Sequence, residues 1–188
     1  MKEFLGKLQY NSPVTLTFTF LSLVILLLGY ITDGKTTNLL FEVYRSSWSD
    51  PLNYFRLFGH VLGHMDWNHY TNNMVLFLVS GPILEEKYKS QSFFIMIAIT
   101  AVVSGLFHVI LFPSTVLLGA SGIVFMMIVL SSAAGMKDGK IPLTLILVVI
   151  IYLGGEIISV GSKDGIAHIA HILGGICGAA FGLLNRRS

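Results

Sequence analysis

Ser121 lies in a setting that can carry nucleophilic chemistry. It follows Gly119-Ala120 and precedes Gly122, at the start of an apolar run. Serine alone is a weak nucleophile and needs a general base within hydrogen-bond reach. A matching base, His171, lies fifty residues later, near the start of the last apolar run. The pair predicts acyl transfer by a Ser–His dyad, provided that the fold brings the two side chains together.

The composition predicts a membrane protein. Of the 188 residues, 54% are hydrophobic and 12% are charged, whereas soluble domains carry roughly 25% charged residues. A helix needs about 20 apolar residues to cross a bilayer, and the longest stretch without charge, 90–136, has room for two helices with a turn at Pro113-Ser114. We therefore expect one all-α membrane domain over residues 1–188, with six transmembrane helices near 13–32, 69–87, 91–112, 119–136, 141–159 and 165–185.

The segment 33–68 is the one long connection in this scheme. It contains many aromatic and leucine side chains that must be buried somewhere, so we expect a long structured loop between the first and second helices. Lysine and arginine favour the cytoplasmic side, which predicts a multi-pass protein of the cell membrane with both termini in the cytoplasm. The cationic residues on that side are Lys2, Lys7, Lys87, Lys89, Lys137, Lys140, Arg186 and Arg187.

Three polar residues are expected at one depth in the bilayer. Measured along ideal helices from the cytoplasmic charges, Ser121 lies roughly 24 Å, His171 roughly 22 Å and Asn73 roughly 21 Å from that side. Polar groups at such depth are costly unless they face each other or water. The start of the helix that carries Ser121 also offers unpaired N–H groups to an oxyanion. The coincidence therefore favours a buried catalytic site.

The sixth expected helix has a stripe of small residues that suits close packing. Gly174, Gly178 and Gly182 follow His171 at spacings of three, four and four. Such stripes allow helices to approach closely in lipid, and this one carries His171 at its outer end.

These residues resemble the rhomboid family of intramembrane serine proteases. Gly119-Ala120-Ser121-Gly122 is similar to the GxSG nucleophile motif, and Ala170-His171-Ile172-Leu173-Gly174 with Gly178 is similar to AHxxGxxxG. A third block contains Arg56, His64, Trp67, His69 and Asn73, followed by Gly81-Pro82-Ile83-Leu84-Glu85. The three blocks occur in the order of the family, from about Arg56 to Gly182.

The resemblance implies roles for these residues. Ser121 would attack a peptide bond in or near a transmembrane segment of a substrate protein, with His171 as base and then acid. Asn73, His69 and the Ser121 backbone N–H would hold the oxyanion, and Gly119 would permit close backbone approach. Arg56 and Glu85 would hold the loop and the second helix. The partners would be membrane proteins and lipid, with no cofactor.

Several alternatives stay open at this stage. His168 precedes His171 by one turn and is the second candidate for the base. Asn73 is a candidate for hydrogen bonding between helices, and Glu156 is a candidate to orient His171. His60 and His64 have the spacing of zinc ligands but lack the glutamate of a metalloprotease helix, so we expect no metal, and the net charge of +2 gives no support for a nucleic-acid partner. A catalytically inactive rhomboid-like scaffold that binds membrane proteins is the alternative function.

Overall fold

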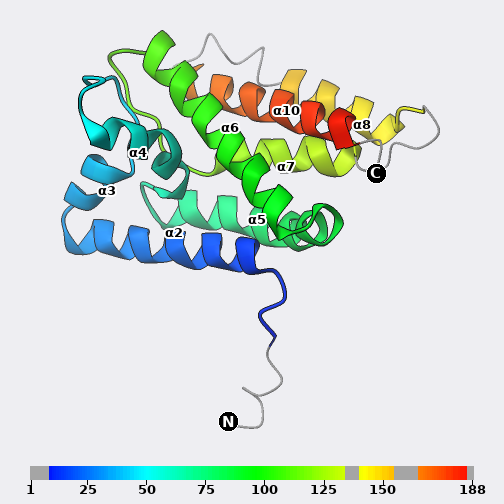
Figure 1. Cartoon of the computed structure of the whole chain (residues 1–188), viewed down its shortest axis with the longest axis horizontal. Helices are drawn as coiled ribbons and strands as arrows, with labels where there is room; N and C mark the ends of the chain where they lie inside the picture. Colours follow the sequence, from blue (N-terminus) through cyan, green and yellow to red (C-terminus); the bar gives the residue numbers. More distant parts are fainter. Residues whose placement is uncertain (1–8, 134–139, 155–164, 186–188) are drawn as a thin grey trace.

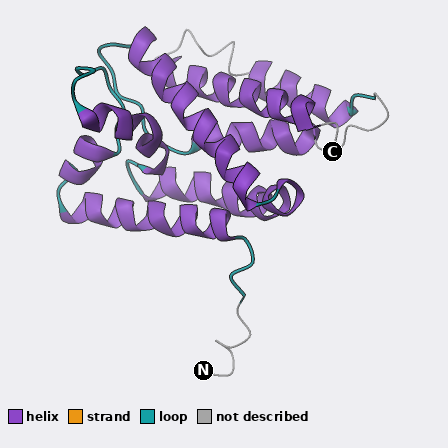
Figure 2. Cartoon of the chain, viewed as in Figure 1, coloured by secondary structure: helices purple, strands orange, loops and turns teal. Residues whose placement is uncertain are grey.

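The regular structure of the chain is helical. The computed structural model describes residues 9–133, 140–154 and 165–185. Within these ranges the secondary structure consists of helices, and Val43 and Leu117 form an isolated antiparallel β-bridge (Figure 2). The all-α class predicted from the sequence agrees with this arrangement.

A helix overlaps each of the six ranges that the hydropathy pattern indicates. These helices are α2 (Pro13–Ile31), α5 (Trp67–Tyr88), α6 (Ser90–Leu111), α7 (Ser121–Ala133), α8 (Leu143–Val148), which continues into the π-helical η2 (Val149–Leu153), and α10 (Gly165–Leu184). In Figure 1, α2 and α5 run side by side, α7 and α10 form a second pair, and α6 runs diagonally in front of α7 and α10 toward the end of α5. The expected start of the fourth helix at residue 119 differs from the structure, in which α7 begins at Ser121.

Two helices meet the requirements of a membrane span by length and composition. They are α2, with 19 residues, and α6, with 22 residues. At about 1.5 Å per residue, each approaches or exceeds the thickness of a hydrocarbon core of roughly 30 Å. α7 and the part of α10 from His168 to Leu184 are also apolar but shorter.

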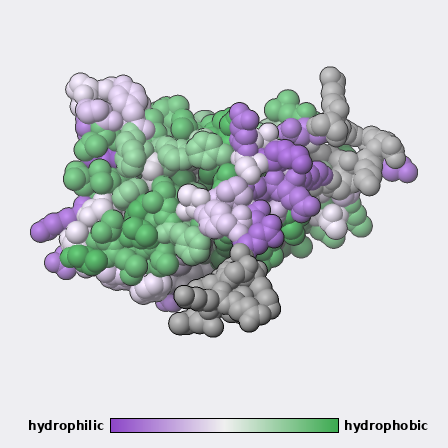
Figure 3. Space-filling model, turned by 60° about the horizontal axis from the view of Figure 1, so that its bottom comes forward, coloured by the Kyte–Doolittle hydropathy of each residue, from purple (hydrophilic) through white to green (hydrophobic). Residues whose placement is uncertain are grey.

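Large apolar side chains cover much of the outer surface. Ile31 is 77% exposed, Ile83 66% and Val79 65%, and Figure 3 shows a broad hydrophobic face. Monomeric soluble proteins rarely expose apolar patches of that extent. The surface is therefore suited to contact with lipid.

The core lies where the two helix pairs meet α6. Phe77 of α5 and Phe93 of α6 are fully buried, and Phe77 stacks on Phe18 of α2 with ring centroids 4.5 Å apart. Met126 and Leu130 contribute the side of α7. Packing of large side chains between the helices fixes their positions, because a void among such residues would forfeit dispersion contacts.

The segment between α2 and α5 contains two short helices and a 3₁₀ turn. They are α3 (Lys35–Leu40), α4 (Pro51–Gly59) and η1 (His60–Leu62). Asp50 caps α4 by accepting a hydrogen bond from the Leu52 N–H, and Pro51 occupies the first helical position, where a proline is well tolerated.

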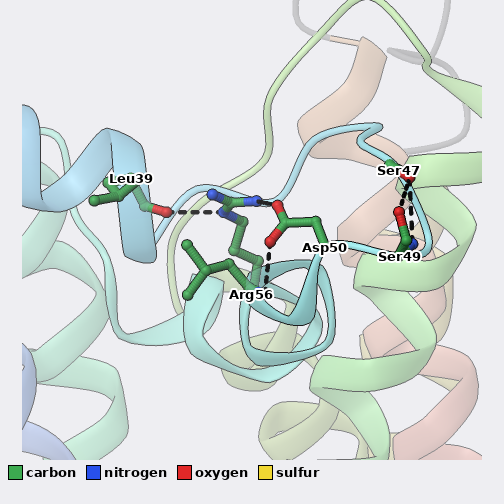
Figure 4. Close-up of polar contacts among 6 residues, drawn as sticks. Leu39, Ser47, Ser49, Asp50 and Arg56 are labelled. Atoms are coloured by element: carbon green, nitrogen blue, oxygen red, sulfur yellow. Dashed lines mark hydrogen bonds and ion pairs between the residues drawn. The ribbon is translucent and has the colours of Figure 1, made fainter.

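Arg56 ties this segment together. Its Nε donates to the Leu39 carbonyl over 2.8 Å, and its Nη1 pairs with Asp50 Oδ2 over 3.0 Å (Figure 4). The guanidinium also lies over the Tyr44 ring, 4.5 Å from the centroid. Arg56 is 2% exposed, so its cation has lost its hydration. These contacts take the place of the lost water.

Glu85 of α5 links its helix to the starts of α2 and α6. The sequence predicts that these three helix ends lie on the cytoplasmic side. The two carboxylate oxygens of Glu85 accept hydrogen bonds from the Val14 and Thr15 N–H groups at 2.9 Å and from the Thr15 hydroxyl at 2.8 Å. Ser90 at the start of α6 donates a further bond of 2.7 Å. The carboxylate thus satisfies N–H groups that the first turn of α2 leaves without helical acceptors.

Lys89, between α5 and α6, has a backbone conformation that favours glycine. Its φ is 69° and its ψ is 149°, a region that residues with a Cβ rarely adopt. We expect Lys89→Gly to raise the free energy of unfolding by about 1 kcal/mol, measured as an increase in melting temperature in detergent micelles. Lys87→Gly, inside the last turn of α5, is the matched control and should lower stability instead. Equal effects of the two changes would contradict the strain argument.

Candidate functional site

The backbone before Ser121 is held from two directions. Val43 and Leu117 exchange two backbone hydrogen bonds of 2.9 and 3.0 Å, and the Gly119 N–H donates to the His60 carbonyl over 2.9 Å. Both partners belong to the segment between α2 and α5. The irregular stretch 112–120 therefore has a defined path and delivers Ser121 to the first position of α7.

Gly119 is required by conformation and by space. Its φ of 117° is in the left-handed region, and a Cβ there would lie 2.6 Å from His69 Nε2. His69 is in the first turn of α5, where its N–H is capped by Asp66 Oδ1 at 2.8 Å. The imidazole of His69 thus lies directly against the backbone two residues before Ser121.

The glycines of α10 bring the helix of His171 onto the helix of Ser121. A Cβ on Gly174 would overlap the Gly122 carbonyl, and a Cβ on Gly178 would overlap the Met126 carbonyl. One turn before Gly174, the Ala170 carbonyl also approaches Gly122. The residues next to Ser121 and next to His171 therefore meet at one crossing point, as close packing through small residues allows.

The ring of His171 lies against α7. It stacks on Phe125 with ring centroids 4.2 Å apart and an interplanar angle of 5°. Phe125 is one helical turn beyond Ser121, so this contact places the imidazole beside the first turn of α7. His69 is also near enough to interact electrostatically with His171, so the structure brings Ser121, His69 and His171 into one region.

His168 lies at the edge of this region. Its ring meets the ring of His171 edge to face, with centroids 6.3 Å apart. His171 lies one turn further along α10 than His168. The contact of Gly174 with Gly122 and the stacking of His171 on Phe125 hold that turn against α7.

Asn73 lies one turn below His69 and is 6% exposed. Its Nδ2 donates to the His69 carbonyl over 3.0 Å. That bond uses one of the two N–H groups of the amide, and it links Asn73 to the turn that carries His69.

The histidines of η1 and the following turn have positions that the spacing did not predict. The His60 ring contacts the Ala101 carbonyl of α6 at 3.1 Å, while its own carbonyl holds Gly119. The His64 ring packs edge to face on His69 with centroids 5.0 Å apart. Burial lowers the pKa of both rings to about 4, so they are neutral at neutral pH. Within the described residues, no group of three or more His, Cys, Asp or Glu side chains is arranged to hold a metal ion.

Glu156, the candidate to orient His171, lies outside the described residues. Cys177 is half-buried and packs against the main core.

Comparison with known families identifies the chain. The model of the rhomboid domain matches residues 51–188, which include α4 through α10 and the residues His69, Asn73, Ser121 and His171. A search of curated proteins found no match. Members of this family are intramembrane serine proteases or their inactive homologues. Because the match covers most of the chain, the resemblance drawn from the three motif blocks is confirmed, and the chain belongs to the rhomboid family.

Proposed function

We propose that this chain is an intramembrane serine protease that hydrolyses peptide bonds in or near transmembrane segments of membrane proteins. The observation that carries the proposal is the crossing of α7 and α10 at Gly122 and Gly174. This crossing lies beside the one serine and the one histidine that match the nucleophile and base motifs of the family. A packing role alone would not call for a histidine at the head of the glycine stripe.

In the proposed mechanism, His171 removes the proton of the Ser121 hydroxyl as the oxygen attacks the scissile carbonyl. The protonated imidazole then donates to the leaving amine, and water repeats the sequence to release the acyl group. Stacking on Phe125 restricts rotation of the His171 ring. Such positioning lowers the barrier because the base is already oriented when the substrate arrives.

The oxyanion would lie at the start of α7. Backbone N–H groups of the first turn lack helical acceptors and carry the positive end of the helix dipole. The Ser121 N–H, with His69 and Asn73, would donate to the oxygen, and Gly119 leaves room for the His69 ring. Donors that are aimed before reaction at the developing charge are among the largest contributions to catalysis.

The proposed topology is a single domain over residues 1–188 with six spans and both termini in the cytoplasm of the cell. Support comes from the lysine and arginine distribution and from the helix in each expected range. The segment 33–66 would then lie at the outer face, above the level of Ser121. The expected substrates are membrane proteins, with no metal or nucleic acid in the reaction.

A fluorophosphonate probe separates this function from that of an inactive rhomboid-like scaffold. The probe phosphonylates a serine only when a base activates its hydroxyl. We expect the purified protein to be labelled on Ser121, as located by peptide mass spectrometry, and Ser131→Ala, further along α7, to label like the unaltered protein. Absence of labelling in a protein with a normal helical spectrum would favour the scaffold.

Asn73→Ala should lower kcat more than it raises KM. An oxyanion donor acts on charge that develops in the transition state, and loss of one such donor in a soluble serine protease costs about 10²–10³ in kcat. The control is Asn72→Ala, because Asn72 is exposed on the same helix. A change in KM with full kcat would instead make Asn73 a structural link to the His69 turn.

A further inference from the structure

A cavity of about 330 Å³ lies beside the candidate site, between the outer end of α2, the α3 region and the segment before Ser121. Tyr30, Asp33, Glu42, His64 and Leu118 are among the residues that line it; it is called the Glu42 cavity below. A volume of this order can hold one large side chain. The proposed mechanism makes no use of this cavity.

The β-bridge fixes Glu42 next to the nucleophile segment. Because Val43 and Leu117 pair antiparallel, Glu42 is opposite Leu118, which immediately precedes Gly119. On another wall, His64 contacts the His69 ring. The cavity therefore adjoins the segment that leads to Ser121, and through His64 it adjoins the His69 ring of the proposed oxyanion site.

The cavity presents hydrogen-bond acceptors beside the hydroxyls of Tyr30 and Thr37 and the amide of Asn38. His64 is 1% exposed, its Nδ1 donates to the Leu62 carbonyl at 3.3 Å, and its Nε2 has no hydrogen-bond partner. Since a carbonyl can only accept, the proton of the neutral ring is on Nδ1, and Nε2 presents a lone pair. His64 is one of the residues that line the cavity, and a buried acceptor without a partner calls for a donor.

Two carboxylates add negative charge to this lining. With the Asn38 amide oriented so that its nitrogen faces Glu42, it donates to Oε1 over 3.1 Å, but an amide brings no positive charge. Burial raises the pKa of Glu42, as expected for a carboxylate that lacks a cation. Among the described residues that line the cavity, none is lysine or arginine.

We propose that the Glu42 cavity binds an arginine side chain of the substrate that flanks the cleaved bond. A guanidinium supplies five N–H donors in a planar fork, which suits two carboxylates and the His64 Nε2. The exposed Tyr30 and Met65 at the rim provide apolar contact for its methylene groups. Asp33 follows the end of α2, so the cavity lies at the membrane surface in the proposed topology, where a substrate can carry a charge.

This inference rests on the proposed protease function, and its test uses the full chain in detergent with matched transmembrane peptides. One series carries arginine at successive positions on either side of the cut, and a second carries glutamine there. We expect kcat/KM to be about 10- to 100-fold higher for arginine at one position, the range of a hydrogen-bonded charge pair. Glu42→Gln and Asp33→Asn should reduce this preference, with little change in cleavage of the glutamine peptide.

The control variant is Glu86→Gln, which removes an exposed carboxylate from α5 outside this cavity and should keep the full preference. No preference for arginine at any position, or a preference that survives in the Glu42→Gln/Asp33→Asn variant, would overturn the inference. Binding of fluorescent peptides to Ser121→Ala provides a readout without turnover. If the unaltered protein cleaves no substrate and is not labelled by the probe, the protease proposal fails. Equal binding of the arginine and glutamine peptides to Ser121→Ala would reject the cavity proposal separately.

Discussion

Replacing Ser121 with alanine is expected to abolish cleavage of a transmembrane substrate. The change removes the only atom of the proposed dyad that forms a bond with the substrate, so no acyl intermediate can form. In a soluble serine protease, loss of the nucleophile costs about 10⁶ in kcat, which would place the residual rate below detection. The measurement is the initial rate of cleavage of a purified substrate reconstituted with the enzyme in liposomes.

The fold should survive this substitution. Ser121 begins α7, and alanine keeps the same backbone geometry with one polar atom fewer. The circular dichroism spectrum and melting temperature should therefore stay close to those of the unaltered protein. Ser131→Ala, at the other end of α7, is the matched control and should retain full cleavage. Unchanged turnover by Ser121→Ala would contradict the serine-protease proposal.

Replacing His171 with alanine is expected to eliminate both cleavage and fluorophosphonate labelling. Without its base, the Ser121 hydroxyl stays protonated and reacts slowly with either substrate or probe. Loss of the base costs nearly as much as loss of the nucleophile when the two act as a unit. Measurement of both readouts matters, because a defect confined to substrate binding would leave the labelling intact.

His168→Ala is the matched control for His171. The two histidines are three residues apart and differ in height by roughly 4.5 Å along the helix axis, so one of them is aligned with Ser121. His168→Ala should retain measurable cleavage and labelling. The opposite pattern, with activity lost in His168→Ala and kept in His171→Ala, would move the base by one turn. The enzyme class would stand, but the assignment from the glycine stripe would be wrong.

Hydrophobic runs and motif residues carried much of the information about this protein. The all-α class, the approximate ends of the helices and the rhomboid family could be predicted from the sequence, because each depends on local composition or on short motifs. The glycine stripe after His171 also indicated which face of that helix packs closely. In the structure, Gly174 and Gly178 meet the backbone of α7.

The neighbours of the candidate site could not be read from the same patterns. The spacing of His60 and His64 invited a zinc hypothesis, whereas in the structure the His60 carbonyl holds Gly119 and the His64 ring contacts His69. Both belong to a segment with little periodicity, so hydropathy did not show which way their side chains point.

The location of Glu42 illustrates what the tertiary structure decided. In the sequence, Glu42 is a single acidic residue in a loop, 76 positions before Leu118. The pairing of Val43 with Leu117 places it beside the nucleophile segment. The sequence by itself determined which residues are helical and which types could do chemistry, because backbone propensity and hydrophobicity act over a few neighbouring positions. Only the tertiary structure decided which of them meet, because contacts between distant segments depend on how closely the helices pack and on the path that packing leaves for the loops.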